Sequence, residues 1–163
     1  MFDTNSLIAK YHNTTALSHT TKSLLNMISS GLFYAAMFSF FVSLFFTVFF
    51  TTGENISGFW VLTTGWLGFV IFQFAWFANP LSLLAVLIMK KRPVIALILC
   101  TLAVALASMG FLFSEIPTAK GAEKIFIKEY GLGFYFWYAA QWFLLYSVIL
   151  LVLGRGIKKA GNK

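Results

Sequence analysis

The chain has 163 residues, of which 60% are hydrophobic and only 10% are charged, and its formal net charge is +7. Because an ordinary soluble domain is about a quarter charged, this chain has too few charges to cover a water-facing surface. The composition therefore excludes a soluble enzyme domain. The basic residues lie between apolar blocks rather than along an amphipathic face, so they indicate membrane topology and not nucleic-acid binding.

Four long uncharged stretches follow one another, and each has at least ~20 residues, enough for a helix to cross a hydrocarbon core about 30 Å thick. We therefore predict an all-α transmembrane protein built as a four-helix membrane bundle. The first stretch is too long for a cleaved signal peptide and is predicted to remain as an anchor. The expected organisation is a polar cytoplasmic tail over residues 1–27, a single transmembrane domain over 28–154 with helices at about 28–50, 64–89, 93–114 and 131–153, and a basic cytoplasmic tail over 155–163.

The residues of the N-terminal tail leave two alternatives open. The Thr, Ser and Asn content is typical of a disordered segment, whereas Leu7, Ile8 and Tyr11 suit a short helix at the membrane interface. The tail also holds His12 and His19. Two such ligands without further support make a poor metal site, so we interpret both histidines as solvated side chains.

Lysine and arginine are distributed unequally between the loops. If each stretch crosses once, nine basic residues fall on one side and three on the other, which by the positive-inside rule puts both termini in the cytoplasm. The nine are Lys10, Lys22, Lys90, Lys91, Arg92, Arg155, Lys158, Lys159 and Lys163, and the three are Lys120, Lys124 and Lys128. The same outer loop carries Glu115, Glu123 and Glu129, which we interpret as part of a charge-balanced, solvated surface.

The second stretch, residues 55–89, is the least regular of the four. Its 35 residues would form a helix of about 52 Å, far longer than the hydrocarbon core. Pro80 lacks a backbone donor, so we predict a crossing helix over residues 64–89 that is kinked at Asn79-Pro80.

The residues of this stretch leave two alternatives open. An alternative to the kinked helix ends the crossing at Ala78 and lays residues 81–89 along the inner interface. Residues 55–63 either lie at the outer interface, anchored by tryptophan, or enter the membrane.

Three segments resemble a known group of proteins. The run SGFWVLTTGWLG, then AWFANPL, a basic turn and an Ala- and Leu-rich helix resembles a group of uncharacterised small bacterial multi-pass inner-membrane proteins. The segment GLGFYFW resembles the aromatic start of that group's last helix. The resemblance covers roughly Ser57 to Trp142, with Phe77 where the group more often has tyrosine. It implies a multi-pass protein of the bacterial inner membrane and no particular activity.

Small residues form two seams along the predicted helices. The third helix has Ala96, Cys100, Ala103, Ala107, Gly110 and Ser114 at alternating steps of four and three, which keeps them on one face. The first helix has Gly31, Ala35, Ser39, Ser43 and Thr47 at steps of four. Because helices in lipid associate by close packing of small residues, we predict that both seams contact neighbouring helices. Cys100 is interpreted as a packing residue.

The residues favour binding over catalysis or transport. No catalytic, cofactor-binding or metal-binding pattern is visible, so we expect no enzyme activity, no cofactor and no metal. Gln73, Asn79 and Gln141 are the candidate intramembrane polar contacts, interpreted as interhelical hydrogen-bonding groups. The predicted function is a non-enzymatic, partner-binding or accessory role in the bilayer, with another membrane protein or a second copy as partner. The alternative is a small oligomeric transporter or channel for a neutral solute.

Overall fold

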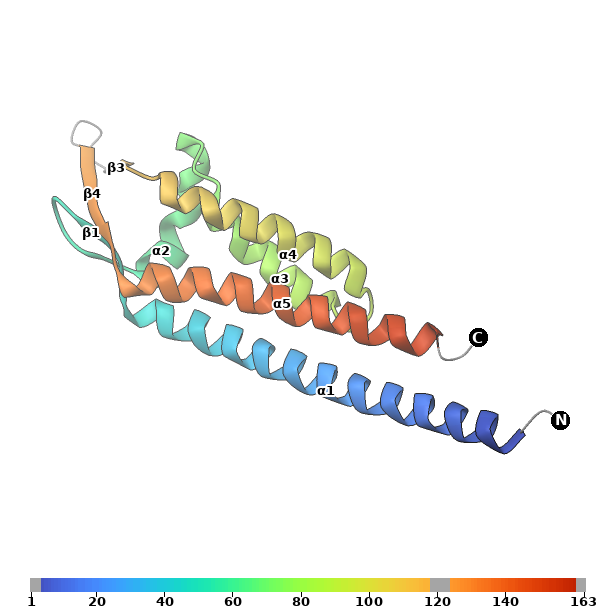
Figure 1. Cartoon of the computed structure of the whole chain (residues 1–163). Coiled ribbons are helices and arrows are strands. Elements are labelled where there is room, and N and C mark those ends of the chain that lie inside the picture. The colour runs from blue at the N-terminus through green and yellow to red at the C-terminus, as the bar shows by residue number, and fades with distance from the viewer. Residues whose placement is uncertain (1–3, 118–123, 161–163) are drawn as a thin grey trace.

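The computed structural model describes residues 4–117 and 124–160, and it combines long helices with a small sheet at one end (Figure 1). The α-helices are α1 (Thr4–Phe45), α2 (Gly58–Thr64), α3 (Ala78–Ile88), α4 (Pro93–Ser108) and α5 (Leu132–Ala160). Three short 3-10 helices are η1 (Gly65–Ile71), η2 (Ala75–Phe77) and η3 (Met109–Leu112). The strands are β1 (Thr47–Thr51), β2 (Ile56–Ser57), β3 (Glu115–Pro117) and β4 (Lys124–Tyr130).

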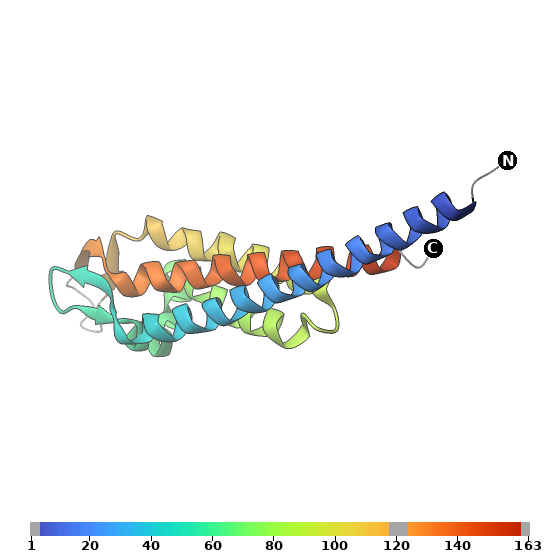
Figure 2. The same cartoon turned by 60° about the horizontal axis from the view of Figure 1, so that its bottom comes forward.

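In the part of the chain that the structure describes, three helical segments are long and apolar enough to cross a membrane. They are Thr20–Phe45, Pro93–Leu112 and Leu132–Gly156, so three of the four predicted crossings exist as helices of membrane length. Helix α1 runs along α5, and the N and C ends of the chain lie at the same end of the molecule (Figures 1 and 2). We call this the basic end, and the opposite end, which holds β1 to β4, the sheet end.

Helix α1 begins at Thr4 and is 42 residues long, so the polar tail is neither a separate interfacial helix nor a disordered segment. Once a helix has nucleated, each further residue adds a hydrogen bond without repeating the cost of nucleation. The helical conformation of the apolar part of α1 can therefore continue into the polar tail. At 1.5 Å per residue the helix is about 63 Å long, and its N-terminal part extends beyond the other helices (Figure 2). The side chains of residues 4–19, including both histidines, are outside the described set.

The predicted helix over residues 64–89, kinked at Asn79-Pro80, is wrong. Residues 65–71 form η1, residues 72–74 form a turn, and the continuous helical part that follows, Ala75–Ile88, is shorter than a membrane span. Pro80 is the third residue of α3. In the first turn of a helix a backbone N–H has no intrahelical acceptor, so proline begins α3 without a kink. The structure thus does not confirm the predicted four-helix bundle. It has three helices of membrane length and, in place of the predicted second helix, a series of short helices over residues 58–88 (α2, η1, η2 and α3), which we call the broken path.

The structure is mostly helical, as predicted, but it is not all-α, because the segments beyond the helix ends form an antiparallel sheet in the order β2-β1-β4-β3. Helix α1 ends at Phe45 rather than residue 50, and the β-branched and aromatic sequence TVFFT forms β1. In β4, half-buried Ile125 and Ile127 alternate with exposed Phe126 and Lys128, the period of a strand with one covered face. The loop predicted to be solvated therefore contributes a strand, although Glu123 lies outside the described residues.

The sheet is held against the helix ends by backbone contacts. The Gly58 N–H donates to Phe46 O over 3.0 Å, and the Gly131 N–H donates to Val48 O over 2.9 Å. A Cβ added to Gly131 would lie against the Thr47 carbonyl group, and one added to Gly58 would lie against the Ser43 carbonyl group. At both positions only glycine lets the two backbones approach this closely.

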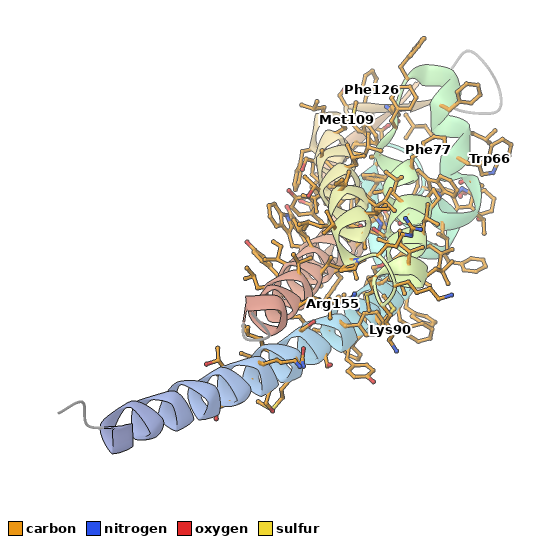
Figure 3. The ribbon with its side chains drawn as sticks, turned by 90° about the vertical axis from the view of Figure 1, so that its right-hand side faces the viewer. Trp66, Phe77, Lys90, Met109, Phe126 and Arg155 are labelled. Atoms are coloured by element: carbon orange, nitrogen blue, oxygen red, sulfur yellow. The ribbon has the colours of Figure 1, made fainter. Side chains whose placement is uncertain are left out.

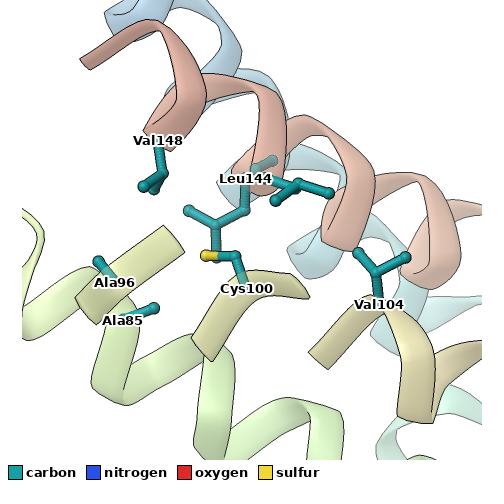
Figure 4. Packing of buried hydrophobic residues seen from close by; sticks show 8 residues of the cluster. Ala85, Ala96, Cys100, Val104, Leu144 and Val148 are labelled. Atoms are coloured by element: carbon teal, nitrogen blue, oxygen red, sulfur yellow. The ribbon is translucent and has the colours of Figure 1, made fainter. Parts of the chain in front are cut away.

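The small residues of α4 are packed against α3 and α5 (Figure 4). Ala96, Cys100, Ala103 and Ala107 have exposed fractions of 0–1%, and Gly110 of η3 is also buried. Ser114, the last member of the predicted seam, is exposed beyond the end of η3. Because these side chains are short, the helix backbones approach closely and gain dispersion contacts, the main source of association between helices in lipid.

The buried face of α1 differs from the predicted seam and packs along α5. Ser39 and Ser43 are buried, but Gly31 is exposed and Ser29 is buried instead. A step of four residues drifts around an α-helix, so the predicted stripe leaves the contact. Ser29 Oγ donates to Ser147 O of α5 over 2.9 Å, and Ser147 Oγ donates to Ser29 O over 2.8 Å.

At the basic end, the turn between α3 and α4 is tied to α5. Arg155 Nη2 donates to Lys90 O over 2.6 Å, and the two residues lie near each other in Figure 3. The α3–α4 hairpin thus returns to the end from which the chain started.

Candidate functional site

A cavity of about 340 Å³ lies at the sheet end, lined by segments that are far apart in the sequence. This volume is at the lower limit of the range of about 300–1,000 Å³ found for ligand pockets. Helices α1 and α5 form two walls, the sheet closes the end, and α2, η1 and η2 cover the side. The lining residues are Phe40, Ser43, Leu44, Val48, Phe49, Ile56, Gly58, Trp60, Val61, Leu62, Thr64, Gly65, Leu67, Gly68, Gln73, Ala75, Trp76, Asn79, Gly110, Phe113, Phe134 and Trp137.

Phe134, in the first turn of α5, is the centre of an aromatic cluster that supports the cavity. It has an exposed fraction of 1%. Its ring lies edge-on to Phe111, with centroids 4.8 Å apart, and 4.7 Å from the Tyr130 ring. Pairs of this geometry contribute about 0.5–1.5 kcal/mol beyond the burial of their area. The cluster fixes the junction of η3, β4 and α5 in one arrangement.

Two tryptophan side chains of the lining join these segments by hydrogen bonds. Trp76 Nε1 donates to Leu62 O over 3.0 Å, which connects η2 to α2. Trp137 Nε1 donates to Asn79 Oδ1 over 2.8 Å, which connects α5 to the start of α3. The three segments with the sequence resemblance, SGFWVLTTGWLG, AWFANPL and GLGFYFW, therefore meet around this cavity.

The chain turns back on itself between η1 and η2. Phe72 has a φ of 59°, in the left-handed region, where a non-glycine residue is uncommon. The turn is closed by the Gln73 N–H, which donates to Gly68 O over 2.8 Å. The Phe72 N–H also donates to Phe69 O, over 3.2 Å, so both amides at the reversal have acceptors within the segment, as lipid surroundings require.

The three predicted polar residues lie in two different places. Gln73 and Asn79 both line the cavity. Gln141 is buried nearer the middle of α5, with an exposed fraction of 4%, and its Oε1 accepts from Ser82 Oγ of α3 over 2.5 Å. Pro80 lies beside Asn79 in the first turn of α3, and the α4 seam lies along the helix contacts, with Gly110 at the cavity wall.

Tyr130, at the end of β4, anchors the sheet to the end of the α4–η3 segment. Its hydroxyl group lies 3.0 Å from Phe113 O and 3.2 Å from Gly110 O, which are its acceptors. Burial, and to a lesser extent the Tyr135 hydroxyl group, raises the pKa of Tyr130 above its usual value. The group therefore remains neutral at physiological pH and keeps its proton for donation.

Sequence reasoning did not identify the tryptophans and Phe134 as parts of one site. From the sequence, tryptophan near residues 55–63 was expected only as an anchor at the outer interface. Single glycines that recur near these aromatic residues were the sequence feature that could have indicated close packing here. Gly65, for example, faces the Trp76 ring, and Gly110 faces the Phe134 ring.

No protein-family model matches the chain, and no curated protein and no solved structure matches it. Function is therefore inferred from the cavity itself. Its walls are mainly aliphatic and aromatic, with two hydroxyl side chains and two neutral amides. In the described parts of the chain, no three His, Cys, Asp or Glu side chains are grouped so that they could hold a metal ion. This chemistry is complementary to an uncharged, apolar ligand.

We expect Trp137→Phe to destabilise the protein by about 1 kcal/mol in mild detergent, because the Asn79 carbonyl oxygen loses its donor. Thermal unfolding measures this loss. Trp66→Phe is the matched control, since Trp66 Nε1 donates to Thr63 O at an exposed site. Equal unfolding temperatures for the two variants would contradict a structural role for the Trp137–Asn79 hydrogen bond.

Proposed function

We propose that the chain is an integral membrane protein with a non-enzymatic binding role, as an accessory subunit or partner-binding protein of the bilayer. The observation that carries the proposal is the cavity at the sheet end, whose lining residues include no ionisable side chain. Catalysis and ion transport generally require such groups, whereas binding of an apolar group does not. The partner is a component of the same membrane: a lipid, another membrane protein or a second copy of this chain.

The proposed location is the bacterial inner membrane, with both termini in the cytoplasm. The basic turn between α3 and α4 is at the end of the molecule from which the chain starts and at which it finishes (Figure 1). A concentration of Lys and Arg at one end favours the cytoplasmic side for that end. The sheet and the cavity then lie at the outer surface of the membrane.

A small oligomeric channel or transporter for a neutral solute is the second candidate. One observation favours it: Gln73 and Asn79, two neutral hydrogen-bonding side chains, line the same cavity. Solute flux into liposomes that is lost on changing Gln73 or Asn79 to leucine would support this function. Flux that is equal with and without the protein would count against it.

The test of the binding role is affinity purification from native membranes in a gentle detergent, followed by native mass spectrometry. Val61, half-buried in α2, lines the cavity, whereas Thr63 is exposed on the same helix outside the lining. We expect the wild type to retain a bound component at fixed stoichiometry, Val61→Phe to lose it and Thr63→Phe to keep it. A wild-type protein without any bound component, or equal retention by Val61→Phe, would contradict a binding role for the cavity.

A further inference from the structure

The cavity opens at the outer surface of α2 and η1. Among the described lining residues, Trp60 and Leu67 have the largest exposed fractions, 60% and 49%. Trp60 belongs to α2 and Leu67 to η1, whereas the lining residues of the sheet and α5 are buried or half-buried. These two side chains therefore mark the exposed edge of the cavity, which we call its mouth, on the side covered by α2 and η1.

The surface around this mouth is apolar. Phe59, Trp66, Phe69 and Phe72 have exposed fractions of 61%, 50%, 58% and 78%, and Trp66 projects outward in Figure 3. The sequence from residue 55 to 89 contains no ionisable side chain. Exposed apolar area of this kind marks a protein or membrane contact rather than a water-facing surface, and tryptophan is typical of the membrane interface.

The depth of the cavity agrees with contact to lipid. Its walls include Phe40 and Ser43 in the last turns of α1 and Trp137 in the second turn of α5. These residues lie at the ends of two segments that are long and apolar enough to cross a membrane. In the proposed orientation these walls therefore lie at the level where hydrocarbon chains begin.

Four hydrogen-bond donors in the walls are already directed to protein acceptors. Trp76 and Trp137 donate as described above, Ser43 Oγ donates to Phe40 O over 2.6 Å, and Thr64 Oγ1 donates to Trp60 O over 2.7 Å. Most of the remaining wall consists of hydrocarbon and aromatic surface. A water-filled or sugar-filled cavity would need free polar partners, whereas a hydrocarbon chain gains dispersion contacts with every wall.

We propose that the cavity holds a hydrocarbon chain of a membrane lipid, which enters sideways between Trp60 and Leu67. This proposal rests on the binding role proposed above and names the class of ligand. The lipid headgroup remains outside the mouth, at the membrane surface near α2. The bound chain fills the space between α2, η2 and α5 and so supports the sheet end.

Quenching of tryptophan fluorescence by brominated lipid tests the proposal. In a parent variant, Trp60, Trp66 and Trp142 are changed to phenylalanine, which leaves the half-buried Trp76 and Trp137 of the cavity wall. The full-length protein is placed in phosphatidylcholine vesicles with or without bromine on the acyl chains. We expect strong quenching in the parent, loss of most of it in Val61→Phe, and no change in Thr63→Phe.

A second variant covers the case that Val61→Phe does not fold. Leu67→Lys puts a charge at the mouth at a half-exposed position, where the fold tolerates it, and it is also expected to lower the quenching. Quenching that is equal in the parent and in folded Val61→Phe or Leu67→Lys would overturn the lipid proposal. If native mass spectrometry then showed a protein bound in a Val61-dependent manner, the binding role would stand and the ligand would be a protein. Loss of both signals in every form would overturn both proposals.

Discussion

Changing Gly131 to alanine is expected to destabilise the protein by about 3 kcal/mol or more, because the new methyl group would lie against the Thr47 carbonyl group. The methyl group is fixed to the Gly131 backbone and the atoms that it meets belong to the Thr47 backbone, so a side-chain movement cannot relieve the clash. Either the Gly131–Val48 hydrogen bond or the β1–β4 pairing must shift. Thermal unfolding in mild detergent, with size-exclusion chromatography, measures the effect.

The matched control is Gly31→Ala in α1. A Cβ added to Gly31 has no atom within 4 Å, and alanine is a better helix former than glycine by up to about 1 kcal/mol. This control is therefore expected to be neutral or slightly more stable than the wild type. A Gly131→Ala protein that elutes and unfolds like Gly31→Ala would show that β1 does not pack on the start of α5 in this way.

The helices of membrane length could be predicted because their signal is local. An uncharged run of about 20 residues has few structural options in lipid, since backbone groups must be satisfied within the segment. The buried face of α4 could also be predicted from the heptad spacing of small residues from Ala96 to Ala107, because this spacing depends only on the geometry of one helix. The bounds of α4 with η3 and of α5 accordingly lie close to the predicted ranges.

The broken path between α1 and α3 could not be predicted because competing local rules apply to it. Pro80 is compatible with a kink inside a helix and with the first turn of a helix. Which of the two forms depends on the reversal of the chain at Phe72 and on the contact of Gly65 with Trp76. The periodicity of a single helix carries no information about such contacts. The uncharged composition and the position of Pro80 favoured a kinked helix over residues 64–89.

The sheet was missed for a related reason. The residues of β1 continue the apolar run of α1, and a short apolar segment does not by itself distinguish strand from helix. What makes it a strand is pairing with β4, about 80 residues later in the chain, where Phe49 is opposite Tyr130. The site combines both difficulties, because its cavity is formed where the sheet and the broken path meet.

Changing Ala107 to leucine is expected to destabilise the protein by about 2–3 kcal/mol, because α4 loses its close approach to α3 and α5. Ala107 has an exposed fraction of 0% and is packed with Ala78 and Ala103. The larger side chain must separate the helices or adopt a strained rotamer. Because Trp137 packs against the same cluster, the displacement also reaches the cavity wall and is expected to shift tryptophan fluorescence.

Ala105→Leu is the control, since Ala105 is exposed on the same helix and leucine there faces the surroundings of the protein. It adds the same volume with the same helix propensity cost, so the difference between the two variants reports packing alone. We expect Ala105→Leu to unfold at the wild-type temperature and Ala107→Leu to unfold earlier or to aggregate in mild detergent. Ala107→Leu protein that remains intact, correctly sized and as stable as Ala105→Leu would contradict close packing at the α4 seam. In that case the packing of α4 against α3 and α5 would not be what holds the cavity walls in place.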